Sequence, residues 1–192
     1  MRIISGTSKG RKLVTPKSQF LRPTSDRVKE SIFNILREEM EGKVVLDLFA
    51  GTGNLGIEAL SRGANKAIFV EKGRQALRLI QRNLNQFGLE ERSEIIPKDA
   101  IRAIGILKQR GESFDLILMD PPYEKGLIQG TLMKLNSYPI YHKDSILVIE
   151  HDRREPLPHI RNGWNLIRER RIGDTVISFL TPQGENHKTE VK

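Results

Sequence analysis

The chain has 192 residues, contains no cysteine and carries a formal net charge of +8. This length fits one α/β domain, and the lack of thiols excludes both a disulfide framework and a thiolate metal site. The histidines are scattered without HExxH spacing, so no metal is expected. No apolar run reaches the length of a membrane span or a signal-peptide core, which predicts a cytoplasmic protein without a membrane partner.

The positive charge is concentrated at the start of the chain. Residues 1–29 hold eight basic side chains against one acid, which leaves a net charge of only +1 for the rest. Such a cluster is the expected footprint of a polyanionic partner, and a solvated basic arm is the alternative. Gly6 and Gly10 indicate a loop that is free to follow a phosphate backbone. The candidates for RNA contact in this loop are Lys9, Arg11 and Lys12.

In chain order, residues 1–23 predict short strands and loops, and a helix capped by Thr24 or Ser25 then runs to about Met40. Strands and helices alternate after that. The strands are expected near 44–49, 66–71, 94–97, 114–119 and 145–150, and the helices near 54–62, 73–87, 100–110 and 126–135. The strands are apolar without a period of two, which is typical of a parallel sheet covered on both faces.

The end of the chain departs from this alternation. Residues 164–172 and 175–181 flank Gly173-Asp174 and predict an antiparallel hairpin. From Pro182 onward the residues are polar, and we expect a frayed tail. The expected organisation is a basic N-terminal extension with its helix over 1–43, one α/β domain over 44–181 and a tail over 182–192.

A strand end, a glycine turn and a helix start coincide in residues 47–56, which read DLFAGTGNLG. Gly51 and Gly53 allow backbone N–H groups to approach a ligand closely. Glu71 ends the next strand, where an acid can hold ribose hydroxyls. This arrangement predicts an adenosine-type ligand, with a tight turn that binds nothing as the alternative.

Two further acids bear on the identity of that ligand. Asp47 lies four residues before the turn, where its carboxylate can order the turn or engage a positively charged ligand. S-adenosylmethionine carries an ammonium and a sulfonium, whereas NAD would place a pyrophosphate there, so Asp47 favours S-adenosylmethionine. Asp99 follows the third strand and can accept from an adenine amino group or cap the next helix.

The strand over 114–119 ends in Asp120-Pro121-Pro122-Tyr123. In open α/β sheets the chemistry lies beyond the carboxyl ends of the strands, and two prolines make a stiff loop without competing N–H donors. Asp120 and the Pro121 carbonyl can therefore grip one NH2 group, and Tyr123 offers a face for stacking a base. Positioning of the amino nitrogen would be the main catalytic contribution, on a base that is unpaired or flipped out. A plain Pro-Pro turn is the alternative, and methylation of cytosine C5 is excluded because it needs a cysteine.

Over residues 44–181 these motifs resemble class I S-adenosylmethionine-dependent methyltransferases. The N-terminal stretch, with RIISG, KGRKL and RPTSDR followed by FNIL, resembles the bacterial 16S rRNA guanine-N2 methyltransferase family. The resemblance implies a Rossmann-like α/β fold with a mostly parallel seven-stranded sheet. It also implies methylation of a specific guanine N2 in 16S ribosomal RNA, within a small-subunit particle.

By the same resemblance, specific residues take specific roles. The cofactor positions are Asp47, Gly51, Gly53, Glu71 and Asp99; the catalytic positions are Asp120, Pro121, Pro122 and Tyr123; and Arg22 and Arg27 lie at the mouth of the active site. Three alternatives stay open. They are an adenine-N6 methyltransferase acting on DNA or RNA, an NAD-linked oxidoreductase built on the GxGxxG pattern, and a catalytically silent RNA-binding protein.

Overall fold

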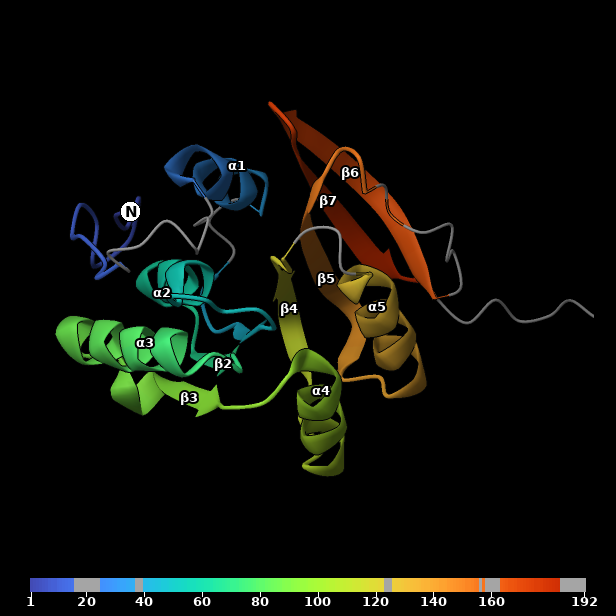
Figure 1. The fold of residues 1–192 in the computed structure, drawn as a ribbon, viewed down its shortest axis with the longest axis horizontal. Coiled ribbons are helices and arrows are strands. Elements are labelled where there is room, and N and C mark those ends of the chain that lie inside the picture. Colours follow the sequence, from blue (N-terminus) through green and yellow to red (C-terminus); the bar gives the residue numbers. More distant parts are fainter. Residues whose placement is uncertain (16–24, 37–39, 123–125, 156, 158–162, 184–192) are drawn as a thin grey trace, which may run out of the picture.

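The computed structural model describes residues 1–15, 25–36, 40–122, 126–155, 157 and 163–183. Helices and strands alternate through most of this part of the chain (Figure 1). The elements are α1 (Asp26–Leu36), β1 (Val44–Asp47), α2 (Asn54–Ser61), β2 (Lys66–Val70), α3 (Arg74–Phe87), the 3-10 turn η1 (Glu90–Arg92), β3 (Ser93–Ile96), α4 (Ala100–Gln109), β4 (Phe114–Met119), α5 (Leu127–Ser137), β5 (Tyr141–Asp152), β6 (Trp164–Ile172) and β7 (Thr175–Pro182).

The strands form one seven-stranded sheet in the order β3-β2-β1-β4-β5-β7-β6. Neighbours from β3 to β5 pair in parallel, whereas β7 runs antiparallel to both β5 and β6. The Rossmann-like fold with a C-terminal antiparallel hairpin, predicted from the sequence, is confirmed. The strand order reverses between β1 and β4, and ligands of such sheets bind beyond the carboxyl ends of the strands at that point.

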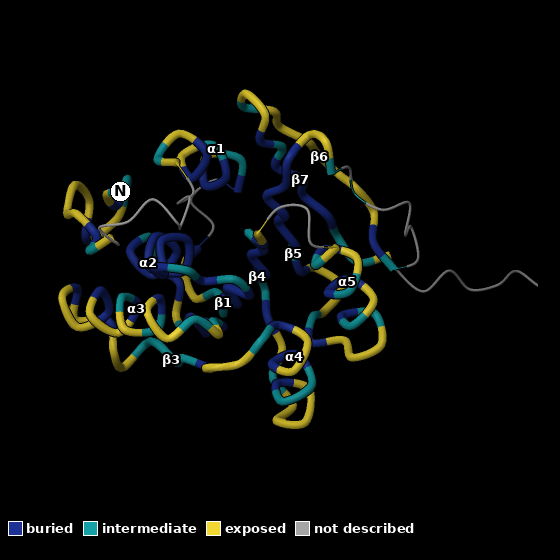
Figure 2. Tube along the Cα trace, in the orientation of Figure 1, coloured by how far each residue is buried: buried dark blue, intermediate teal, exposed yellow. Residues whose placement is uncertain are grey.

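Two apolar cores lie on the two faces of the sheet. Val45 and Leu118 pack beneath α1, α2 and α3, whereas their neighbours Leu46 and Ile117 pack against α4 and α5. This alternation is the period of two of a β-strand with both faces buried. Every residue of α2 is buried, because the sheet covers one side and the N-terminal segment and α1 cover the other (Figure 2).

Some element boundaries differ from the sequence prediction. Within the described residues α1 ends at Leu36, and Met40 lies in a turn rather than in the helix. β5 is twice as long as expected: it begins at Tyr141, which pairs with Phe114 of β4, and pairing with β7 extends it as far as Asp152. β7 in turn reaches Pro182, which pairs with Trp164, so the chain stays ordered one residue past the predicted end of the strand.

The N-terminal segment is packed onto the domain, which corrects the expectation of a free loop. Ile3 and Leu13 belong to the core beneath α1 to α3. Within residues 1–15, the described part of the predicted short strands, one bridge joins Arg2 and Lys12. A Cβ atom on Gly6 would lie 1.7 Å from the Ser61 carbonyl oxygen, so this glycine permits close contact with α2 rather than mobility.

Candidate active site

Five acids surround the carboxyl ends of the parallel strands. One acid lies at or near the end of each strand from β1 to β5, and these acids are Asp47, Glu71, Asp99, Asp120 and Glu150. For four of them, the residue two positions earlier belongs to the core beneath α1, α2 and α3; these residues are Val45, Phe69, Leu118 and Val148. Because side chains alternate along a strand, these four acids project toward the same face of the sheet.

The glycine turn between β1 and α2 depends on backbone geometry that other residues resist. Gly51 and Gly53 have φ angles of 55° and 81°, in the left-handed region. Gly56 serves close packing instead, since a Cβ there would lie 2.3 Å from the Phe69 ring. The left-handed turn and the packing of α2 against β2 thus depend on these glycines, and the close approach of a ligand to the turn stays a prediction.

Asp47 is fully buried beside this turn. Its Oδ2 accepts a hydrogen bond of 3.1 Å from the Gly56 N–H, so the carboxylate orders the start of α2. Burial raises the pKa of Asp47 to about 7; the Gly56 hydrogen bond opposes this rise, and the charges of Asp120 and Glu71 add to it. A positive ligand charge would favour the ionised carboxylate and relieve this cost.

Glu71 binds three backbone amides with its two carboxylate oxygens. Its Oε2 accepts from the Gly51 N–H at 3.0 Å, and its Oε1 accepts from the N–H groups of Lys72 and Gly73 at 2.8 and 2.7 Å. The side chain thus fastens the glycine turn to the end of β2. Carboxylate oxygens have further lone pairs, so the predicted hydrogen bonds to ribose hydroxyls are compatible with this role.

Asp99 adopts one of the two roles that the sequence left open. Its Oδ1 accepts from the Arg102 N–H at 3.0 Å and caps α4. It also lines the cavity described next, together with Lys98. A role toward a bound adenine stays a prediction.

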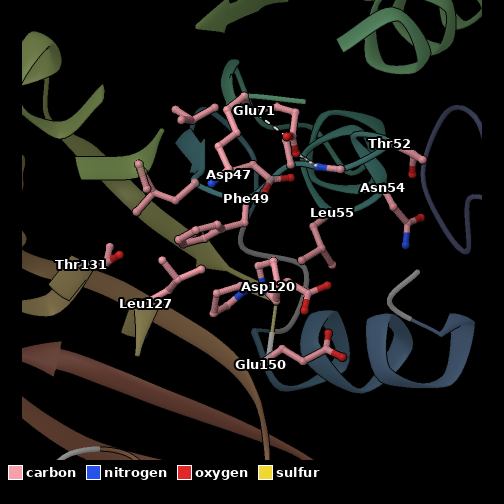
Figure 3. A pocket seen from close by; sticks show the side chains of 18 of the residues that line it. Asp47, Phe49, Thr52, Asn54, Leu55, Glu71, Asp120, Leu127, Thr131 and Glu150 are labelled. Atoms are coloured by element: carbon pink, nitrogen blue, oxygen red, sulfur yellow. Dashed lines mark hydrogen bonds between the residues drawn. The ribbon is translucent and has the colours of Figure 1, made fainter. Parts of the chain in front are cut away.

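A cavity of about 490 Å³ joins these acids, a volume that suits a small organic ligand. In Figure 3, Glu71 and Asp47 lie at one end, Glu150 lies at the other, and Asp120 lies between them. The remaining lining residues are Met1, Ser25, Val28, Leu48, Phe49, Ala50, Gly51, Thr52, Asn54, Leu55, Val70, Lys72, Lys98, Asp99, Ala100, Ile101, Pro121, Pro122, Leu127, Thr131 and Thr175.

The predicted catalytic motif lies at the wall of this cavity. Asp120 and Pro121 follow β4 directly, and Pro121 is buried whereas Pro122 is exposed. The charge of Asp120 contributes to the raised pKa of Asp47, so the predicted catalytic residue lies close enough to the predicted cofactor residue to affect it. Tyr123 lies outside the described residues.

Glu150 was not singled out from the sequence, although it ends a predicted strand as Glu71 does. It is 5% exposed and lines the cavity. The residues that α1 and β7 contribute to the wall were also missed, since their approach to β5 depends on long-range packing. These are Val28 of α1, Ser25 directly before it, and Thr175 of β7.

A buried ion pair holds α1 and the N-terminal segment on α2. Lys29 Nζ lies 3.3 Å from Glu58 Oε2, and both side chains are fully buried. Lys29 also donates to Asn54 Oδ1, whereas Glu58 accepts from the backbone N–H of Ile4 and the Nε of Arg62. Burial lowers the pKa of Lys29, and the Glu58 carboxylate opposes that change. This network keeps α1 in place as a wall of the cavity.

The predicted RNA-contact residues differ in their surroundings. Lys9 and Lys12 are exposed, whereas the Arg11 guanidinium donates to the Gln86 carbonyl and lies over the Phe87 ring, 4.5 Å from its centroid. Arg11 therefore anchors the N-terminal segment to α3. Arg27 is exposed on α1, in the turn that carries cavity residues Ser25 and Val28. Arg22 lies outside the described residues.

The described part of the chain offers neither a metal site nor a membrane-spanning helix. No group of three or more His, Asp or Glu side chains there is arranged to hold a metal ion. Among the helices of these ranges, none has both the length and the apolar character needed to cross a bilayer.

Comparison with known proteins places the chain in a family. The model of the family described as Conserved hypothetical protein 95 matches residues 1–181. The chain is 38% identical to "Putative rRNA methyltransferase YlbH" of Bacillus subtilis, over 96% of its own length and 100% of the relative. It is 34% identical to "Ribosomal RNA small subunit methyltransferase D" of Escherichia coli K12, over 97% and 93% of the two chains.

A solved structure agrees with these relatives. The structure of "Putative methyltransferase yhhF from Escherichia coli" superposes with a TM-score of 0.84 at 31% identity, covering 95% of this chain and 98% of the other. The resemblance inferred from the N-terminal motifs and the Asp120–Tyr123 motif is therefore confirmed.

Proposed function

Because the chain belongs to the family described as Conserved hypothetical protein 95, we propose that it is a ribosomal RNA methyltransferase. Its donor is S-adenosylmethionine and its target is the N2 amino group of one guanine in small-subunit ribosomal RNA. The observation that carries this proposal is the acidic cavity at the strand ends, into which Asp120 and Pro121 project from β4. The name of the Escherichia coli relative supports ribosomal RNA of the small subunit as the substrate.

The polar groups that line the cavity fit S-adenosylmethionine. Asp47 and Glu71 offer carboxylates to a ligand with two positive groups, and the glycine turn offers a close backbone approach. NAD fits less well, since its pyrophosphate would meet the buried Asp47. When bound, S-adenosylmethionine supplies an electrophilic methyl group. Asp47 would hold the charged end and Glu71 the ribose hydroxyls.

Asp120 and the Pro121 carbonyl position the nucleophile. The lone pair of an aromatic amine is delocalised into the ring, which makes the nitrogen a poor nucleophile. Two acceptors that hold its hydrogens favour a pyramidal nitrogen whose lone pair points at the methyl carbon. When the nitrogen takes the methyl group from the donor's sulfonium, it would carry a surplus proton, and Asp120 or water would accept it. The base must be flipped out or unpaired to reach the cavity.

Identification of the methylated nucleoside tests the proposed function. Small-subunit particles and naked ribosomal RNA that lack the modification are incubated with the protein and labelled S-adenosylmethionine, and the nucleosides are analysed by mass spectrometry. We expect N2-methylguanosine, and the substrate that is labelled shows whether an assembled particle is required. N6-methyladenosine would instead establish the adenine-N6 methyltransferase alternative. The absence of label in both substrates would contradict the proposed activity and favour a catalytically silent RNA-binding protein.

Exposed lysines of the N-terminal segment are expected to contact RNA phosphates. Replacing Lys9 and Lys12 together by alanine should flatten the dependence of log affinity on log salt by about 1.5 units, because each phosphate contact releases counterions. Cofactor affinity should not change, because neither side chain lines the cavity. RNA binding is measured across a salt series.

The matched control for this experiment replaces Lys108 of α4 and Lys143 of β5, which are exposed and lie outside the N-terminal segment. This control removes the same charge and should leave the slope unchanged. Parallel lines for wild type and the Lys9 and Lys12 variant would show that the segment does not bind phosphate.

A further inference from the structure

Glu150 lies beside the catalytic Asp120 at the base-binding end of the cavity. β4 and β5 pair in parallel with Met119 opposite Ile149, so the next position along the two strands brings Asp120 and Glu150 together. Both residues line the cavity, and Figure 3 shows their carboxyl groups directed into the same part of it. The register of β4 with β5 therefore places the two acids side by side.

The chemistry of methyl transfer leaves Glu150 without a role. Asp120 and the Pro121 carbonyl already supply the two acceptors for the amino group, and the cofactor acids lie at the far end of the cavity. Yet Glu150 is 5% exposed and lines the cavity. Because Glu150 lines the same cavity as Asp120 and follows the same strand register, a base that reaches Asp120 also comes within reach of the Glu150 carboxylate.

We propose that Glu150 determines base specificity by accepting a hydrogen bond from the N1–H of the flipped guanine, while Asp120 accepts from the adjacent N2 amino group. This inference rests on the proposed function. Two carboxylates on neighbouring strands then read two neighbouring donors on one edge of the base. An ionised carboxylate only accepts hydrogen bonds. Glu150 would therefore favour a base whose ring nitrogen beside the amino group carries a hydrogen.

The bases with an exocyclic amine differ at that ring nitrogen. In guanine, N1 beside the amino group carries a hydrogen and donates. In adenine and cytosine, the corresponding ring nitrogens, N1 and N3, are acceptors with a lone pair. A carboxylate at Glu150 would attract the first and repel the other two. Glu150 would therefore explain how an Asp-Pro-Pro-Tyr motif, which grips any amino group, is confined to guanine.

The test compares guanine with 2-aminopurine at the target nucleotide. 2-Aminopurine keeps the amino group at C2, but its N1 is an acceptor. With the substrate identified above, wild type should methylate guanine about 10²-fold more efficiently, in kcat/KM, than 2-aminopurine, the scale on which one contact to a base edge discriminates. In Glu150→Gln, whose amide can donate to the bare N1, the preference should fall at least tenfold.

Each result of this comparison is decisive. The ratio of the two substrates within one variant does not depend on how much of the protein folds. The control Glu90→Gln makes the same change at an exposed site by the opposite edge of the sheet and should keep the wild-type ratio. An unchanged ratio in Glu150→Gln, with both substrates slowed equally, would overturn the inference. If wild type makes no N2-methylguanosine, the proposed function itself is wrong.

Discussion

Asp120→Ala is expected to slow methyl transfer by about 10²- to 10³-fold, the scale on which removal of one precisely placed polar group acts in an active site. The alanine side chain cannot hold the amino hydrogens, so the lone pair is no longer aimed at the methyl carbon. Cofactor affinity should fall by less than tenfold, because Asp47 and Glu71 still line the other end of the cavity. Single-turnover rates and calorimetric cofactor titrations measure the two effects separately.

Asp120→Asn distinguishes a positioning role from proton transfer. The asparagine amide keeps one oxygen that accepts a hydrogen bond, so this variant should retain measurable turnover if positioning dominates. An asparagine variant as inactive as alanine, in a folded protein that still binds cofactor, would make Asp120 a general base. Asp174→Ala, in the exposed turn of the β6–β7 hairpin, is the matched control and should keep the wild-type rate.

Asp47→Asn is expected to make the folded protein more stable at neutral pH while it weakens cofactor binding. The pKa of Asp47 rises from 3.8 to about 7 in the folded protein because the group is buried. Between these values the unfolded chain has released a proton that the folded chain still holds. The free energy of unfolding of wild type therefore falls as pH rises from about 4 to 7, by roughly 4 kcal/mol in total.

Asparagine does not titrate and still offers an oxygen to the Gly56 N–H. The stability gained by Asp47→Asn should therefore grow by roughly 2–3 kcal/mol between pH 5 and pH 8, and urea unfolding at several pH values measures it. Asp174→Asn, an exposed acid, should follow the wild-type curve. If the stability gained by Asp47→Asn did not depend on pH, the pKa of Asp47 would not be raised in the folded protein.

The buried Asp47 lowers the stability of the folded protein, and we expect it to strengthen cofactor binding. Asp47 destabilises the cofactor-free protein because its charge is buried near the charges of Asp120 and Glu71. A cationic ligand favours the ionised form of Asp47, so binding should release a proton below pH 7. Cofactor affinity should accordingly increase with pH up to about 7 in wild type and lose this dependence in Asp47→Asn.

Much of the fold and part of the site follow from local sequence. The order of strands and helices, the parallel sheet and the hairpin could be read from periodicity and turn residues, because these depend on neighbours a few positions away. Four acids at strand ends could be identified for the same reason, since parallel strands bring their carboxyl ends to one edge. Glu150 ends a predicted strand as well, and this pattern could have identified it.

The tertiary structure decided the features that depend on distant partners. Glu150 meets Asp120 only through the register of β4 with β5, and pairing with β7 extends β5 beyond its predicted end. The basic N-terminal segment reads as a free arm, yet Lys29 and Glu58 bind it to α2, and Arg11 stacks on α3. The sequence alone does not show whether a charged side chain faces solvent, an opposite charge or an aromatic ring. The contacts of Lys29 and Arg11 are with residues 25 and 75 positions away, and only the fold brings them together.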